Sequence, residues 1–280
     1  MIIKILKMIK FEHSVFALPF AFIAAFMAQK NVPPFEKTGW ILLAMVSARS
    51  AAMAFNRIAD LHYDKQNPRT SHWILPQREL SLYFVAGFVL INCALFFFSA
   101  HQLNNLCFKL SPVALFIILT YSFTKRFTCF THFFLGLSLS LAPMGAWLAI
   151  KEKFELVPAL LSVSVILWTA GFDIIYSTQD TDFDRLNHLH SIPARFGIKA
   201  ALFISSLCHT LMVIILISIY YLNALGIYFL TGIIIASIFL LWQHSVVKPN
   251  DLSKVNEAFF AANGLLSVFL LIFTVLDVLR

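Results

Sequence analysis

Charged residues are scarce in this chain. Only 12% of its 280 residues are Asp, Glu, Lys or Arg, whereas 60% are hydrophobic. This composition excludes an ordinary soluble domain and indicates a polytopic membrane protein. The net charge of +7 does not indicate nucleic-acid binding, because the basic residues gather at the ends of apolar segments and do not alternate with aromatic residues on a polar surface.

Cysteine is also rare. The four cysteines stand far apart in apolar surroundings and form no Cys-x-x-Cys pair, so we predict neither a disulfide nor a metal site from Cys93, Cys107, Cys129 and Cys208. The chain lacks a Walker A loop, a dinucleotide-binding fingerprint and a nucleophile elbow. The sequence therefore gives no sign of nucleotide binding or hydrolase chemistry of these three common kinds.

The chain instead contains nine apolar runs, each near the ~20 residues that a membrane-spanning helix needs. The runs cover about residues 13–28, 39–59, 80–100, 112–126, 130–150, 156–176, 200–222, 225–244 and 258–279, with polar loops at 60–80 and 180–199. We predict an all-α polytopic membrane protein of about nine transmembrane helices, folded as a single transmembrane domain over residues 1–280.

The distribution of Lys and Arg predicts the orientation of these spans. Fourteen of the 21 basic residues fall on the side that holds the N-terminus, six fall on the opposite side, and Arg49 lies within a span. Because cytoplasmic loops carry the excess of basic residues, the N-terminus and the loops 60–80 and 180–199 are expected in the cytoplasm.

Acidic residues are few, and six of the 14 fall within two short windows. The first window ends the second apolar run. It places Asp60 and Asp64 four residues apart, with Asn56 four residues before them. Residues four apart share one face of a helix, so three oxygen-bearing side chains are expected to project together.

The second window ends the sixth run and repeats this design. Asp180 and Asp184 are four residues apart and Asp173 lies seven before Asp180, whereas Asp182 is expected to point away from their shared face. Carboxylate and amide oxygens suit Mg²⁺ that is shared with substrate phosphates. Two patches of matched spacing at one membrane face are far less typical of ordinary solvated helix ends, so the pattern predicts a Mg²⁺-bridged diphosphate site.

Basic residues near the acidic windows are candidate anion ligands. Arg49 lies inside the second run on the same face as Asn56 and Asp60, and a buried arginine needs a partner. That partner is either an anionic substrate group or one of the aspartates in a structural ion pair. Lys125 and Arg126 end the fourth run on the motif side, where one of them would neutralise a leaving diphosphate; the alternative is that they only set the topology.

The two windows, with Arg69-Thr70 and Tyr121…Lys125-Arg126, resemble the motifs of the UbiA superfamily of intramembrane prenyltransferases. The segment 171–197, which contains His190-Ser191-Ile192-Pro193-Ala194-Arg195, is similar to the bacterial 4-hydroxybenzoate polyprenyltransferase branch, including its menaquinone-pathway enzymes. Arg57 departs from the pattern, because an aspartate often follows the asparagine in this superfamily. The first motif thus has one possible acidic ligand fewer.

The resemblance implies nine helices around a central cavity in the bacterial inner membrane, a polyprenyl diphosphate donor and an aromatic acid acceptor. The acceptor would be 4-hydroxybenzoate or a related hydroxynaphthoate in ubiquinone or menaquinone biosynthesis, and no nucleic acid is implied. The resemblance also implies catalytic roles for Asp60, Asp64, Asp180, Asp184 and Lys125, with Mg²⁺ held by the four aspartates and Asn56. Substrate contacts are implied for Arg49, Asn56, Arg69, Tyr121, Arg126, Asp173 and Tyr176.

Three alternatives remain open at this point. A prenyltransferase of the same fold could use another acceptor. A secondary transporter would also carry intramembrane charge and internal repeats, but it would not need matched Asp-x-x-x-Asp pairs at one membrane face. A CDP-alcohol phosphotransferase also uses spaced aspartates and Mg²⁺, but its glycine-containing signature is absent here.

Overall fold

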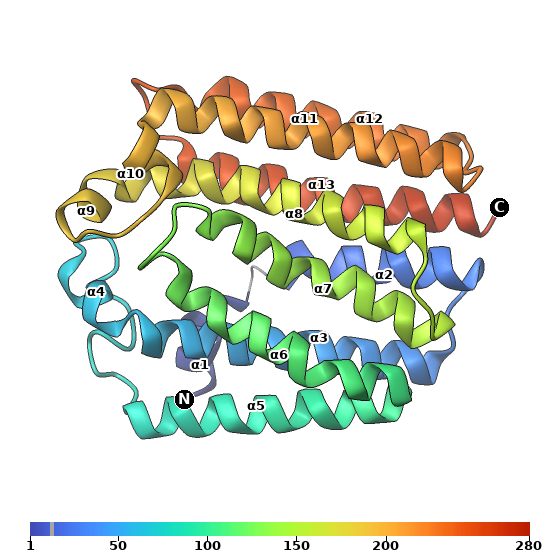
Figure 1. Ribbon diagram of the computed structural model, residues 1–280, viewed down its shortest axis with the longest axis horizontal. Coiled ribbons are helices and arrows are strands. Elements are labelled where there is room, and N and C mark those ends of the chain that lie inside the picture. Colours follow the sequence, from blue (N-terminus) through green and yellow to red (C-terminus); the bar gives the residue numbers. More distant parts are fainter. Residues whose placement is uncertain (12–13) are drawn as a thin grey trace. The chain divides into compact units, whose positions relative to one another are not determined.

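The computed structural model describes residues 1–11 and 14–280, and helices make up most of it (Figure 1). The described residues contain no β-strand, only an isolated bridge between Lys248 and Asp251. By their internal contacts the residues form two compact units. Unit 1 comprises residues 1–14 and 35–123, and unit 2 comprises residues 15–34 and 124–280.

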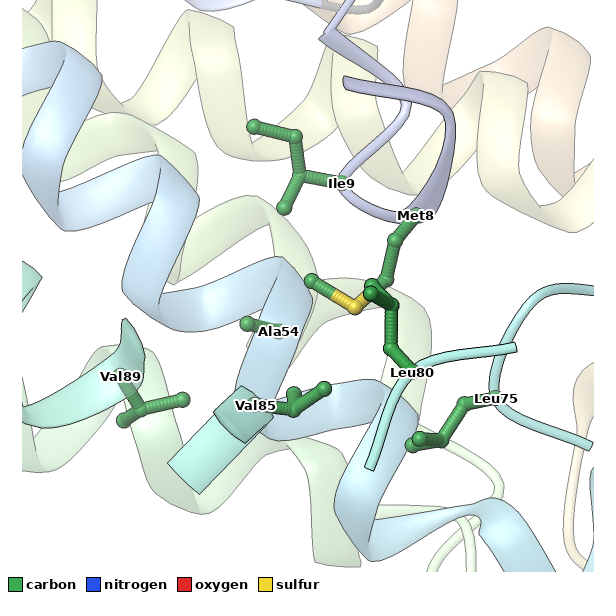
Figure 2. Packing of buried hydrophobic residues seen from close by; sticks show 7 residues of the cluster. All are labelled: Met8, Ile9, Ala54, Leu75, Leu80, Val85 and Val89. Atoms are coloured by element: carbon green, nitrogen blue, oxygen red, sulfur yellow. The ribbon is translucent and has the colours of Figure 1, made fainter. Parts of the chain in front are cut away.

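Unit 1 is built on the long helices α3 and α5, which pack along each other. Its helices are α1 (Ile2–Met8), α3 (Phe35–Ala59), α4 (Leu61–Gln66), α5 (Leu82–Leu103) and α6 (Asn105–Thr124), whose last residue belongs to unit 2. A buried apolar cluster joins the N-terminal segment, α3, α5 and the loop after α4; Figure 2 shows its members, Met8, Ile9, Ala54, Leu75, Leu80, Val85 and Val89. Burial of each large side chain contributes about 1.5–3 kcal/mol, so this cluster holds α1 and the loop against α3.

Unit 2 is organised around α8, which packs against α7, α11 and α13. Trp168, Ile174 and Ile175 of α8 are completely buried, as expected of a helix with neighbours on several sides. The helices of this unit are α2 (Ser14–Gln29), α7 (Thr131–Lys151), α8 (Leu156–Ser177), α9 (Thr181–Leu186), α10 (Ile192–Phe196), α11 (Ile198–Leu222), α12 (Ile227–Val246) and α13 (Val255–Val278), with a 3₁₀ turn, η2 (Thr178–Asp180), between α8 and α9.

Close backbone approach fixes the contact between α7 and α8. A Cβ atom added at Gly136 would lie 2.6 Å from the backbone oxygen of Ile166, so only glycine fits at this crossing. Two buried polar contacts join helices of unit 2: the Trp168 indole donates to Asn263 over 2.9 Å, and the Ser205 hydroxyl donates to the Gly171 carbonyl over 2.7 Å. Such pairing is required where no water reaches the helices.

The predicted fold class is confirmed. Among the described residues, eight helices are long and apolar enough to cross a membrane, and α2 provides a shorter apolar helix. Most predicted runs agree with a helix within a few residues. The first predicted run began at His13, which lies outside the described residues.

The predicted fourth run began too late. Helix α6 starts at Asn105, so Pro112 lies inside it rather than at its start. Asn104 alone separates α5 from α6, and its side chain accepts a hydrogen bond from the Cys107 N–H and caps α6. A proline inside a membrane helix is tolerated because neighbouring polar groups can satisfy the freed backbone carbonyl. The loops predicted at 60–80 and 180–199 also contain the short helices α4, α9 and α10.

Candidate active site

The first aspartate motif runs through the junction of α3 and α4. The backbone N–H of Asp60 donates to the carbonyl of Asn56, and that of Asp64 donates to the carbonyl of Asp60, both over 2.8 Å. Helical hydrogen bonding therefore continues across the junction, and the predicted common face of these three residues is retained. The Asn56 side-chain amide donates to Asp60 Oδ2 over 2.8 Å, which orients the carboxylate.

Asp64 is buried, and a cation of its own unit lies beside it. Arg57 Nη1 lies 3.6 Å from Asp64 Oδ2, and the guanidinium stacks 4.0 Å above the Trp73 ring. Burial raises the pKa of the Asp64 carboxyl above its usual value, and the Arg57 charge opposes that rise. Arg57, which departs from the superfamily pattern, thus supplies a positive charge to this motif.

The second motif crosses a break in regular helix. The hydroxyls of Ser177 and Thr178 donate to the carbonyls of Ile174 and Ile175, three residues back. These bonds compete with helical pairing, and α8 gives way to the η2 turn before α9 begins. The seven-residue spacing of Asp173 and Asp180 therefore does not keep both on one continuous helical face.

The four-residue spacing of Asp180 and Asp184 does keep them together. Both side chains are buried, whereas Asp182 between them is exposed, as their helical spacing predicts. Lys125 Nζ lies 2.7 Å from Asp184 Oδ1, and the Ser191 hydroxyl donates to Asp184 Oδ2 over 2.8 Å. In each unit, the last aspartate of the motif is thus buried beside a cation of the same unit.

Asp173 has a partner that the sequence did not reveal. His132 of α7 is almost completely buried, and its Nδ1 lies 2.7 Å from Asp173 Oδ2 on α8. The other ring nitrogen of His132, Nε2, accepts a hydrogen bond from the backbone N–H of Ile192 over 3.3 Å. The ring therefore joins α7, α8 and the start of α10.

Comparison with known proteins decides the family. The sequence profile of the UbiA prenyltransferase family matches residues 17–268. This chain belongs to the UbiA prenyltransferase family. The predicted superfamily resemblance is confirmed, and with it the class of membrane prenyltransferases.

Relatives of this UbiA-family protein include two bacterial enzymes. It is 26% identical over 255 residues to the 4-hydroxybenzoate octaprenyltransferase of Francisella tularensis subsp. mediasiatica, covering 91% of this chain and 89% of the relative. It is 28% identical over 238 residues to the enzyme of the same name from Vibrio atlanticus, covering 85% and 83%.

Solved structures share the fold. The apo structure of a UbiA homolog from Aeropyrum pernix K1 is 33% identical with a TM-score of 0.87, covering 96% of this chain and 98% of the other. A UbiA homolog from Archaeoglobus fulgidus bound to GPP and Mg²⁺ is 20% identical with a TM-score of 0.77, covering 98% and 99%.

The predicted site residues of the UbiA-family chain divide between the two units. Unit 1 carries Arg49, Asn56, Asp60, Asp64, Arg69 and Tyr121, and unit 2 carries Lys125, Arg126, Asp173, Tyr176, Asp180 and Asp184. The sequence motifs assign no role to His132 or Ser191. His132 did leave a signal, because an ionisable residue within an apolar run is a functional candidate by default.

The donor atoms of the motifs fit a hard cation. Each motif offers a pair of carboxylates, and the first adds an amide oxygen from Asn56. Oxygen donors of this kind suit Mg²⁺. Within residues 1–11 and 14–280, no three His, Cys, Asp or Glu side chains gather closely enough to form a metal site by themselves. Such carboxylate pairs suit a cation that completes its coordination with water and substrate phosphate oxygens.

A cavity of about 540 Å³ lies in unit 2 beside the second motif. Asp182, Arg185 and Lys199 contribute to its lining, but the buried Asp180 and Asp184 do not. The Arg185 side chain is also held in place by a hydrogen bond, because its Nε donates to the Ala194 carbonyl over 2.9 Å. The cavity thus belongs to the exposed side of the motif and not to the buried carboxylates.

Proposed function

We propose that this protein transfers a polyprenyl group from a polyprenyl diphosphate to the ring of an aromatic acid, 4-hydroxybenzoate or a related hydroxynaphthoate, in quinone biosynthesis. The proposal rests on one observation within a UbiA-family chain. The chain has two matched aspartate motifs, and the last carboxylate of each motif is buried beside a cation of its own unit. The bacterial relatives named as 4-hydroxybenzoate octaprenyltransferases support this acceptor class.

Mg²⁺ is the proposed cofactor. Asp60, Asp64, Asp180 and Asp184, with Asn56, are the residues that would hold it together with the diphosphate, and the Archaeoglobus homolog described with GPP and Mg²⁺ supports this choice. When bound, the cation would neutralise negative charge that develops on the leaving diphosphate. Asp64 and Asp184 lie beside Arg57 and Lys125, so each motif also has a protein cation next to its last carboxylate.

The reaction exchanges one bond for another. The bond between C1 of the prenyl group and the diphosphate oxygen breaks with its electron pair leaving on the diphosphate, a ring carbon of the acceptor bonds to C1, and the ring releases a proton. Lys125 and Arg126, with Arg49 and Arg69, are proposed to stabilise the leaving diphosphate. Tyr121, Asp173 and Tyr176 are proposed to contact substrate. The apolar helices exclude water that would otherwise capture the allylic cation.

The two units are proposed to act as one transmembrane domain over residues 1–280. The protein is proposed to lie in the bacterial inner membrane with its N-terminus and both motif loops in the cytoplasm. The excess of Lys and Arg on that side supports this orientation. Both motifs would then meet water-soluble Mg²⁺ and diphosphate at the same membrane face.

Mass spectrometry of products tests the proposal. Membranes containing the protein would receive polyprenyl diphosphates of several lengths, with 4-hydroxybenzoate or hydroxynaphthoates as acceptors. A product mass equal to acceptor plus prenyl group minus one hydrogen is expected, and ring fragments should carry the added prenyl mass. Absence of every such product would refute the proposed reaction and favour a transporter or a phosphotransferase.

Aspartate variants test the site. Asp60→Asn and Asp180→Asn should each lower turnover roughly 10²-fold or more, because each removes charge that positions the diphosphate. The double variant should be hardly worse, since residues that act as one unit are non-additive. Asp182→Asn is the matched control: its exposed side chain lies between the buried pair, and its loss should be mild.

A further inference from the structure

We infer that His132 is a positioning residue that fixes Asp173 as the hydrogen-bond acceptor for a ring hydroxyl of the aromatic substrate. This inference deepens the proposed function and rests on it. Its starting point is the contact of 2.7 Å between His132 Nδ1 and Asp173 Oδ2, made by side chains from two different membrane helices, α7 and α8. His132 has only 1% of its side chain exposed, whereas Asp173 has 24% exposed.

The hydrogen-bonding partners determine which ring nitrogen of His132 carries the proton. The backbone N–H of Ile192 can only donate, so Nε2 of His132 accepts and carries no hydrogen. The remaining ring proton is then on Nδ1, where it donates to Asp173 Oδ2. The His132 ring is thus the donor in this contact, and the Asp173 carboxyl group is its acceptor.

The backbone that holds His132 is itself fixed. Ile192 begins α10, and the preceding Ser191 caps that helix by accepting a hydrogen bond from the Ala194 N–H over 3.3 Å. The same Ser191 hydroxyl donates to Asp184 Oδ2 over 2.8 Å. The His132 ring therefore rests on a segment that the second aspartate motif also holds, which leaves the imidazole little freedom to rotate.

One oxygen of Asp173 is left for a ligand. His132 engages Oδ2, and none of the described residues donates a hydrogen bond to Oδ1, although Asp173 is partly exposed. A carboxyl oxygen with free lone pairs accepts a hydrogen bond, and the hydroxyl of an aromatic acid can donate one. A hydrogen bond from that hydroxyl to Asp173 would raise the electron density of the ring carbons beside it, which are the carbons that attack the prenyl group.

Kinetics with two matched acceptors test the role of His132. With the hydroxylated acceptor, His132→Ala should lower kcat/KM for the acceptor about 10²-fold, while the KM for the prenyl diphosphate stays within about twofold. His132→Asn should recover most of this loss, because its amide nitrogen can replace Nδ1 as donor to Asp173. His190→Ala, which changes an exposed histidine near α10, should behave like the wild type.

The O-methylated acceptor separates positioning from packing. It has no hydroxyl for Asp173 to hold, so wild type and His132→Ala should transfer to it at rates within about threefold of each other. Equal losses with both acceptors, or equal losses in His132→Ala and His132→Asn, would overturn the inference and indicate a purely structural histidine. If His132→Ala does not fold, Asp173→Asn replaces it with the same two expectations. Absence of product from the wild type would refute the proposed function instead.

Discussion

The ion pair between Lys125 and Asp184 provides the sharpest test of how this protein is held together. Asp184 is completely buried, and Lys125 Nζ lies 2.7 Å from its Oδ1. Lys125→Met removes the cation and keeps most of the side-chain volume, so a charged carboxylate is left without its counter-ion. Removing one partner of a buried pair costs about 3–5 kcal/mol. Because a third of the Lys125 side chain is exposed, we expect the lower end, about 3 kcal/mol.

This cost corresponds to a drop in Tm of roughly 6–12 °C, from about 2–4 °C for each kcal/mol in a chain of this size. The double variant Lys125→Met with Asp184→Asn should recover most of the loss, because it removes the stranded charge as well. Purified protein in detergent would be heated at one fixed rate without substrate, and unfolding followed by circular dichroism at 222 nm. The fixed rate matters because membrane proteins often unfold irreversibly.

Lys153→Met is the matched control. Lys153 Nζ also lies 2.7 Å from a carboxylate, that of Glu155, but neither side chain of this pair is buried, with 64% of Lys153 and 33% of Glu155 exposed. An exposed pair contributes about 0–1 kcal/mol, so the Tm of this variant should change little. A Lys125→Met variant as stable as Lys153→Met, or a double variant no more stable than Lys125→Met alone, would contradict a stabilising role for the buried ion pair.

Three further outcomes are expected. Excess chelator should abolish turnover and added Mg²⁺ restore it, because oxygen donors select a hard cation; full activity in chelator would exclude the metal. Gly136→Ala should lower the Tm by several degrees through its clash with backbone, whereas Gly87→Ala, with no atom within 4 Å of its added Cβ, should not; equal thermal melts would contradict the close packing. Tags inserted in loops 60–80 and 180–199 should both be accessible from the cytoplasm. Tags found on opposite sides of the membrane would contradict the proposed shared orientation of the two loops.

Local sequence predicted much of the fold because each apolar run in a membrane must satisfy its backbone hydrogen bonds within its own helix. Helices α7 and α8 end within a residue or two of the predicted runs, where Lys151 and the polar residues after Tyr176 interrupt the apolar sequence. The face shared by Asn56, Asp60 and Asp64 also follows from spacing alone, and the backbone hydrogen bonds confirm it. The predicted start of the fourth run at residue 112 is wrong because a membrane helix tolerates proline in its interior, and α6 continues through Pro112.

The pairing of side chains depends on tertiary structure. Spacing predicts that Asp173 and Asp180 share a helical face, but α8 ends at Ser177 and the 3₁₀ turn η2 begins before Asp180 is reached. Asp173 instead meets His132, a residue 41 positions away, and Asp184 meets Lys125 from the segment after α6. Composition and motif spacing by themselves determined the membrane class, the helices and the family. Only packing decided which charges meet, because the rotation of one helix against another is set by contacts between residues far apart in the chain.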